Sequence, residues 1–446
     1  MGDENHSPWY YYILPVEKLK NFTSEQYEVV ILDEMFISEE DIEQLSNMEE
    51  TEDEEEVGII NEDMAARFLW FKWKSKVPRG HVYVYDEVEQ KYLPVPNVKV
   101  TVTQWCFTHS AYTNDNGYYD LDVTYTTLLQ DNALVTVWFE NKNEDILSFP
   151  FISTGFYSQG HISIGKLGSN DIYLTKDTNA QKYGNIIRAA ELYRIYARKN
   201  GVMNPGKLRI CGVLNSSRGA ALMGNSLGKI ILNSAITNAN IDKEFIKTSL
   251  LNIFSNTDGL IPDIIIGCKK QKSITSTEVI FQNVFHEMAH ASHFTGLDSD
   301  AAVYWSIEYV DMIFGWIEVI FNGGDPFESN NCYNNGKSKR VSFIESWGYF
   351  FGDYLMKEHY GNLSVIYYEG LLNGNSKPEF SFFYNQAYYY LKDIKQYTIK
   401  DIFDIYKKSY ITNAKSFLDE FAIIHNLNST QKQELITVFK NKGAKL

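Results

Sequence analysis

The chain has 446 residues, of which 44% are hydrophobic, and its net charge at pH 7 is −16. This length and hydrophobic fraction allow two or three domains with substantial cores. The negative charge argues against nucleic acid and anionic membranes as partners, because their surfaces are also negative. The sequence contains no run of about 18 or more apolar residues, so it predicts no membrane-spanning segment.

The first 77 residues are interpreted as an acidic N-terminal segment that is only partly ordered. Much of the negative charge lies in residues 49–56, a run typical of a solvated linker. We assign this run no function.

Residues 78–176 alternate apolar and polar side chains in a way that predicts an all-β sandwich. Gly80–Asp86 is a predicted strand, and Pro94–Val102 predicts a turn followed by a second strand. Thr113–Leu121 predicts a hairpin, because its Asn-Asp-Asn-Gly sequence favours positive φ at Asn and Gly. The same turn lacks the ligand spacing of a calcium loop, so it is interpreted as a plain turn.

This order of strands and turns resembles the carboxypeptidase-regulatory-like, transthyretin-type β-sandwich. The resemblance implies a noncatalytic accessory domain of a kind common beside extracellular enzymes. No signal peptide is visible at the polar start of the chain. The expected extracytoplasmic location (secreted, periplasmic or surface-anchored, with the export signal removed) therefore rests on this domain type alone.

Residues 177–446 predict an α+β domain whose C-terminal half is mainly helical. An amphipathic helix is expected at Tyr183–Arg198. Three short apolar runs then predict strands, at Leu208–Leu214, Lys229–Asn233 and Asp263–Ile266. Gly224–Gly228 matches the nucleophile elbow of serine hydrolases, but an elbow follows a strand and opens a helix. Here the motif precedes a strand, so Ser226 is interpreted as a turn residue.

The most informative motif is His286-Glu287-Met288-Ala289-His290. Histidines four residues apart on a helix point the same way from successive turns, so they can bind one zinc ion. A metal held there would polarise a water molecule, and Glu287 could take its proton as general base. A single buried histidine is usually a core residue, but two around a glutamate are hard to bury without a metal.

The surrounding sequence supplies the signals of a helix. Thr275 and Glu278 have capping-box spacing, and apolar residues follow at helical intervals. Gly296 is the expected end of the helix.

A catalytic zinc has three protein ligands plus water, so the third ligand decides the class of site. Glu345 is the expected ligand, because a carboxylate among large apolar side chains needs a buried partner. Gly348 and Gly352 lie on the same helical face, where each glycine costs about 1 kcal/mol, so close approach to the histidine helix is expected. Two alternatives remain open. Glu308 is nearer in sequence, and His293 lies about 10 Å of helix rise from His286.

These residues resemble the gluzincin zinc metallopeptidases, in which His-Glu-x-x-His is completed by a glutamate from a later helix. The resemblance covers roughly the last 250 residues and implies a zincin-like fold acting on a peptide or protein substrate. Glu345 implies a long insertion relative to the thermolysin-like and aminopeptidase groups, so the subfamily stays open. His359, Tyr360 and Tyr304 are candidates for the oxyanion stabiliser by residue type alone.

The alternative function is a noncatalytic binding or adhesion protein built on a zincin scaffold. Retention of Glu287 speaks against it, because a structural zinc site has no use for a general base. The four cysteines are far apart and predict either free buried thiols or at most two long-range bridges; they are Cys106, Cys211, Cys268 and Cys332. The sequence determines neither cleavage specificity nor oligomeric state.

Overall fold

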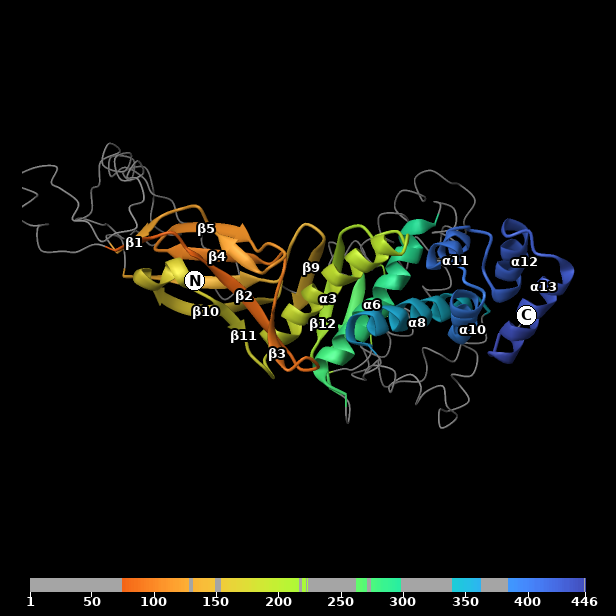
Figure 1. The fold of residues 1–446 in the computed structure, drawn as a ribbon. Helices are drawn as coiled ribbons and strands as arrows, with labels where there is room; N and C mark the ends of the chain where they lie inside the picture. Colours follow the sequence, from red (N-terminus) through yellow and green to blue (C-terminus); the bar gives the residue numbers. More distant parts are fainter. Residues whose placement is uncertain are drawn as a thin grey trace, which may run out of the picture.

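Figure 1 shows the computed structural model of the protein, in which a β-rich region is followed by a mainly helical C-terminal part. The residues that the structure describes are 74–127, 131–148, 154–215, 219–221, 223, 262–270, 274–297, 339–361, 384–444 and 446. Several predictions made above lie outside these residues, namely those for 1–73, Ser226, 229–233, Tyr304, Glu308 and Cys332. The expected order of a β-rich region before a helical half is confirmed.

The β-rich region contains two main sheets. An antiparallel sheet has the strand order β10-β8-β4-β5. Its strands are β4 (Lys99–Gln104), β5 (Phe107–Tyr112), β8 (Asn132–Trp138) and β10 (Phe156–Ser163). A second sheet has the order β11-β2-β3, with β6 also paired to β2. Its strands are β2 (Arg79–Asp86), β3 (Lys91–Pro94), β6 (Tyr118–Asp120) and β11 (Ile172–Leu174). A short pair, β1 (Ser75–Lys76) and β7 (Tyr125–Thr126), and the 3-10 helix η2 (Ile164–Ser169) complete the region.

Alternation accounts for the core of this region. Every second residue of β2 and of β4 is buried, as expected for strands that present one face to a core. The buried valines of both strands belong to one hydrophobic cluster, together with those of β8. The predicted strands at Gly80–Asp86 and within Pro94–Val102 are therefore confirmed.

The predicted hairpin at Thr113–Leu121 is wrong in its pairing. The turn forms, since the Gly117 amide donates to the Asn114 carbonyl at 2.8 Å, and of the four turn residues only Gly117 has a positive φ, 75°. The flanking strands separate, however, because β5 pairs with β4 whereas β6 pairs with β2. The turn thus carries the chain from one sheet to the other. Two other hairpins are present in the described part of this region: β2–β3, and β4–β5, which turns at Trp105 and Cys106.

A third sheet joins the two parts of the molecule. Its order is β13-β14-β12-β9, with β12 parallel to both neighbours and β13 antiparallel to β14. The strands are β9 (Glu144–Ser148), β12 (Leu208–Val213), β13 (Ala220–Ala221) and β14 (Ile264–Gly267). Strand β9 lies within the predicted sandwich range of 78–176, yet it pairs with β12. At its start, buried Glu144 forms an ion pair with Arg194 of the following helix.

Three long helices form the centre of the molecule, with α6 between α3 and α8 (Figure 1). Their bounds are Asn179–Lys199 for α3, Ser276–Gly296 for α6 and Lys339–Tyr360 for α8. Smaller helices follow at the C-terminal end; they are α10 (Asn385–Tyr389), the π-helix η6 (Tyr390–Ile394), α11 (Ile399–Tyr406), α12 (Ala414–Ile424) and α13 (Ser429–Asn441). The predicted helix at Tyr183–Arg198 and the predicted strands at 208–214 and 263–266 are confirmed as α3, β12 and β14.

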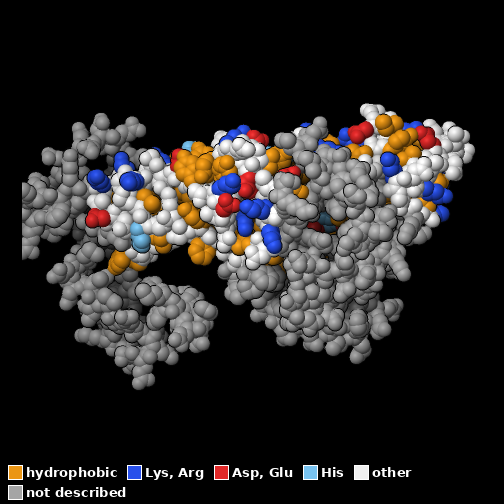
Figure 2. Space-filling view, turned by 90° about the horizontal axis from the view of Figure 1, so that it is seen from below, with side chains coloured by type: hydrophobic (Ala, Val, Ile, Leu, Met, Phe, Trp, Pro, Cys, Tyr) orange, Lys and Arg blue, Asp and Glu red, His pale blue; other side chains and the backbone are white. Residues whose placement is uncertain are grey.

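The surface of the described part is mixed in character. Figure 2 shows basic, acidic and apolar side chains interspersed over the middle of the molecule. None of the helices in the described residues combines the length and apolar character needed to cross a bilayer. Three cysteines are free thiols, with Cys106 exposed and Cys211 and Cys268 buried.

Candidate metal centre

Helix α6 begins and ends where the sequence predicts. The Thr275 side chain caps the helix by accepting a hydrogen bond from the Glu278 amide at 3.2 Å, and Gly296 is the last helical residue. Residues on most sides of the helix are buried, as expected for a helix that is surrounded by other elements. Asn283 fixes it to the sheet by donating to the Gly267 carbonyl at 3.0 Å. The polar residues in its middle are thus carried into the interior.

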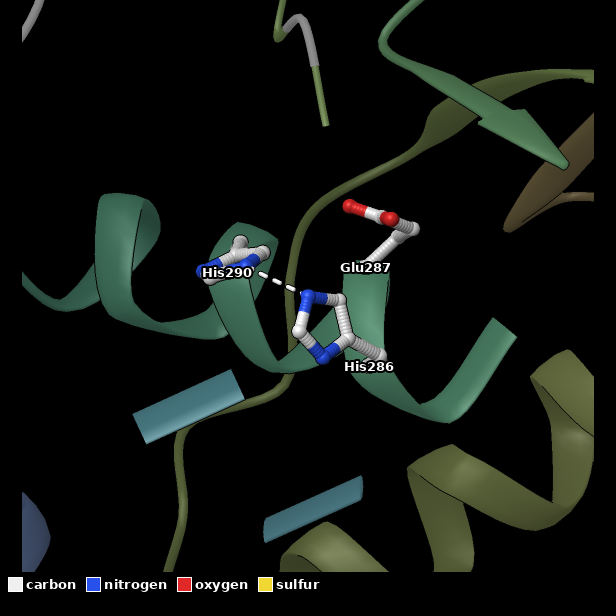
Figure 3. Close-up of side chains that lie close together, drawn as sticks. All are labelled: His286, Glu287 and His290. Carbon is white, nitrogen blue, oxygen red and sulfur yellow. Dashed lines mark hydrogen bonds between the residues drawn. The ribbon is translucent and has the colours of Figure 1, made fainter. Parts of the chain in front are cut away.

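Two helices bring three ligand atoms together. Nε2 of His286 lies 3.0 Å from Nε2 of His290, the facing arrangement seen in Figure 3. From α8, Oε2 of Glu345 lies 3.3 Å from Nε2 of His286 and 3.7 Å from Nε2 of His290. All three residues are buried, with at most 7% of their surface exposed. The predicted set of two imidazoles and a later glutamate therefore meets at one point.

Glu287 lies beside this point. It is 5% exposed, and its carboxylate and the two imidazoles offer ligand atoms within 4.8 Å of one another (Figure 3). The backbone before β13 packs directly on it, since a Cβ at Gly219 would come within 2.9 Å of Oε1 of Glu287. Burial raises the pKa of Glu287 to about 8, although His286 and a hydrogen bond from the Ala221 backbone act in the opposite direction. The edge strand of the sheet thus orients this carboxylate.

The glycines of α8 allow the two helices to approach closely. A Cβ at Gly348 would lie 2.7 Å from Cε1 and Nε2 of His290 and 2.9 Å from Cε1 of His286. A Cβ at Gly352 would lie 3.1 Å from the backbone N and Cα of His286. Any other residue would push α8 away and withdraw Glu345. The packing reason predicted for these glycines is confirmed.

The electrostatics of the three residues suit a cation. Burial by itself raises the pKa of Glu345, but His290 and His286 outweigh it and hold the pKa well below its usual range. Burial lowers the pKa of His290. For His286, burial acts downward, but the charges of Glu287 and Glu345 outweigh it and raise the pKa.

The donor set fits a zinc ion. When both neutral rings carry their proton on Nδ1, the Nε2 lone pairs of His286 and His290 and an oxygen of Glu345 are directed at the same space. Two imidazole nitrogens and one carboxylate oxygen are ligands of the kind that catalytic zinc sites use. The other nitrogen of each ring, Nδ1, is buried and has no hydrogen-bond partner. A bound cation would satisfy the convergent atoms together.

Two residues near the site were not anticipated from the sequence. The ring of Tyr349 lies 4.4 Å from the ring of His286, centroid to centroid. The charge of Asp353 also contributes to the raised pKa of His286. Tyr349 and Asp353 follow Glu345 by one and two helical turns, so the spacing of four residues along α8 was the available signal.

The other sequence candidates lie elsewhere. The His293 ring packs edge-on against Tyr406, with centroids 5.0 Å apart, and burial lowers its pKa to about 3. Tyr360 and His359 are at the far end of α8, about 20 Å of helix rise from Glu345. Their predicted role as oxyanion stabilisers is not supported by this placement.

Compared with protein-family models, curated proteins and solved structures, the chain matches none of them. The site is therefore interpreted from its own geometry.

Proposed function

We propose that the protein is a zinc-dependent peptidase of the gluzincin type. His286, His290 and Glu345 would hold the metal, and Glu287 would be the general base. The observation that carries this proposal is the convergence of three ligand atoms from two packed helices, with the buried Glu287 carboxylate beside them. The three atoms are Nε2 of His286, Nε2 of His290 and Oε2 of Glu345. Three protein ligands leave one position of a tetrahedral zinc for water or substrate, which is the arrangement of catalytic sites.

The side chains divide the chemistry between them. When bound, zinc supplies Lewis-acid polarisation of a carbonyl and lowers the pKa of water. A cation at this point would lower the pKa of Glu287 again and keep it ionised, so that it could accept a proton from water and pass it to the leaving nitrogen. The Ala221 backbone holds the carboxylate in place for both transfers. Burial of Glu287 is costly for a carboxylate without such a task, which favours the peptidase over a noncatalytic binding scaffold.

The sheet supports a peptide substrate. Among the described strands β13 pairs only with β14, and Gly219, which directly precedes β13, lies against the Glu287 carboxylate. An extended peptide can add to such an edge through main-chain hydrogen bonds. We further propose that the C-terminal part is zincin-like and that the β-rich region is a transthyretin-type accessory domain of an extracytoplasmic enzyme.

Metal content and turnover test this proposal together. Purified protein should carry about one zinc ion per chain and cleave members of a peptide library, and a chelator should abolish the cleavage. Glu287→Gln should keep the metal and lose about 10²- to 10⁴-fold in turnover, because it removes the proton acceptor without changing shape.

Glu278→Gln is the matched control, since it makes the same change in the first turn of the same helix, away from the three ligand atoms. Activity of that variant should be unchanged. Stoichiometric zinc without hydrolysis by the wild-type protein, across broad peptide and protein libraries, would favour the noncatalytic binding protein instead.

A further inference from the structure

The end of strand β2 in the β-rich region contacts the helices that carry the metal centre. Asp86 is the last residue of β2, and Glu87 follows it. Between them they contact Arg188 of α3, Thr277 of α6 and Tyr360 of α8. We call these five residues the β2 clamp.

Asp86 is the buried centre of the β2 clamp. It is fully buried, and its Oδ2 accepts hydrogen bonds from Nη1 of Arg188 at 2.6 Å and from the Tyr360 hydroxyl at 2.9 Å. Its Oδ1 accepts from the amides of Val88 and Glu89 at 2.9 and 3.0 Å. Both oxygens are therefore satisfied, and one of them joins the C-terminal end of α8 to α3.

Glu87 completes the N-terminus of α6. The capping residue Thr275 accepts from only one of the first-turn amides, that of Glu278. Oε2 of Glu87 accepts from a second, the Thr277 amide, at 3.0 Å, and the Glu87 amide donates to the Thr277 hydroxyl at 3.3 Å. A carboxylate at this position also interacts favourably with the helix dipole. A residue of the β-rich region thus stabilises the first turn of the helix that carries both histidines.

The geometry of the metal centre depends on how α6 and α8 are placed along their axes. Glycines at 348 and 352 let the helices touch, and beside them the Trp347 indole donates to the Ala289 carbonyl at 3.1 Å, which joins α8 to α6 at the site itself. The ligand atoms belong to different helices, and zinc tolerates deviations of only about 0.2 Å in its bonds. One hydrogen bond leaves the helices free to pivot about it, so contacts that hold their far ends would complete the control of their register.

We propose that Asp86 and Glu87 are positioning residues of the metal centre, which fix the axial register of α6 against α8 through Thr277 and Tyr360. The inference rests on the proposed zinc site and adds a role for the β-rich region in it. The positions match this role, because Thr277 precedes His286 on α6 and Tyr360 follows Glu345 on α8. Both helices are held at the same end of the antiparallel pair, and the ligands lie further along.

Zinc affinity and the visible spectrum of the cobalt-substituted protein test the inference without reference to activity. Tyr360→Phe removes one hydrogen bond of the β2 clamp, and Glu87→Gln removes the negative charge that Glu87 places at the N-terminus of α6; both keep the side-chain shape. Each should weaken zinc about 3- to 10-fold in competition with a chelator, and the double variant about 10- to 100-fold, the range found for residues that support metal ligands. The cobalt absorption bands should shift, because they report ligand geometry.

Tyr119→Phe is the matched control for Tyr360→Phe. Tyr119 is also buried and donates one hydrogen bond, to the Asn170 carbonyl at 2.8 Å, but it lies within the β-rich region. Glu140→Gln, which removes the charge that pairs with Lys99, is the control for Glu87→Gln. Both controls should keep wild-type zinc affinity and an unchanged cobalt spectrum.

The outcomes separate this inference from the proposed function. Wild-type zinc affinity in both clamp variants, or an equal loss in Tyr360→Phe and Tyr119→Phe, would overturn the clamp and leave the zinc site standing. Zinc binding without hydrolysis would overturn the peptidase alone, and a wild-type protein that binds no zinc would overturn both. Should Tyr360→Phe fail to fold, the half-buried Glu87 still provides the test.

Discussion

Two sites on the α6–α8 helix pair make an instructive comparison. In its middle lie His286, His290 and Glu345, and at one of its ends lie Asp86 and Tyr360 with Arg188. Both sites bury charged and polar groups. They differ in how completely those groups are satisfied by the protein itself.

At the β2 clamp, every oxygen of Asp86 has protein partners. At the metal centre, two imidazoles face each other, and the Nδ1 atom of each is buried without a hydrogen-bond partner. On the facing side, two Nε2 atoms and Oε2 of Glu345 converge, and a bound cation would satisfy these three acceptors together. The clamp is organised for stability and the metal centre for a ligand.

The largest expected effect is the loss of zinc when the third ligand is removed. Glu345→Ala leaves two imidazoles, which should weaken zinc binding by orders of magnitude in otherwise folded protein. Metal content after dialysis and circular dichroism measure the two parts of this prediction. Glu308→Ala and His293→Ala should retain the metal. Loss of zinc in either of them, with retention in Glu345→Ala, would reassign the third ligand.

A smaller effect, on the free energy of unfolding, is expected from a change of pH at the β2-clamp end of the helix pair. Burial and the neighbouring Arg188 lower the pKa of His359 to about 4, against about 6.5 in an unfolded chain. Between these values the unfolded state binds more protons, so the free energy of unfolding falls as the pH drops from about 6.5 to 4. This group accounts for up to about 3 kcal/mol, reduced by its partial exposure.

Urea unfolding at pH 7 and at about pH 4.5 measures this loss. His359→Gln cannot titrate, so its stability should depend less on pH than that of the wild-type protein. His161→Gln, which changes an exposed histidine of β10, should behave like the wild type. An acid dependence identical in all three proteins would show that the cluster around His359 is open to water.

The smallest effect concerns the glycine contact between α8 and the two histidines. Gly348→Ala gains about 1 kcal/mol in helix propensity but places a Cβ against His290, and overpacking costs about 1–3 kcal/mol. The expected result is a net loss of roughly 1 kcal/mol in the free energy of unfolding, together with weaker zinc binding. Gly206→Ala is the control, because a Cβ there meets nothing within 4 Å. Unchanged zinc affinity in Gly348→Ala would contradict the close helix contact.

The metal centre was predictable from the sequence because the signals that define it are local. Thr275, the histidine spacing and Gly296 define α6 within a short segment. Glycine destabilises a helix interior, so the two glycines of α8 indicated a close helix contact although the sequence did not show which helix was the partner. Hydrophobic spacing likewise placed α3 and the first strands.

The clamp end could not be predicted because its members are distant in sequence. Asp86 ends a strand, which gives a carboxylate an ordinary exposed position, and its partners lie 102 and 274 residues further along. Strand β9 presents the same difficulty, since only the partner decides which sheet a short strand joins. The turn at Gly117 was recognised, but turn chemistry does not say which strands its arms will join.

Strand β9 also determines how far the molecule can be divided. The chain leaves the β-rich region at β9 to pair with β12, returns for β10 and β11, and leaves again through α3. A cut near residue 176 would leave β9 on one fragment and its partner β12 on the other. It would also separate Glu144 from Arg194. We therefore expect the two halves to unfold as one cooperative unit, and a transplant of the β-rich region into another protein would have to carry β12 with it or replace β9.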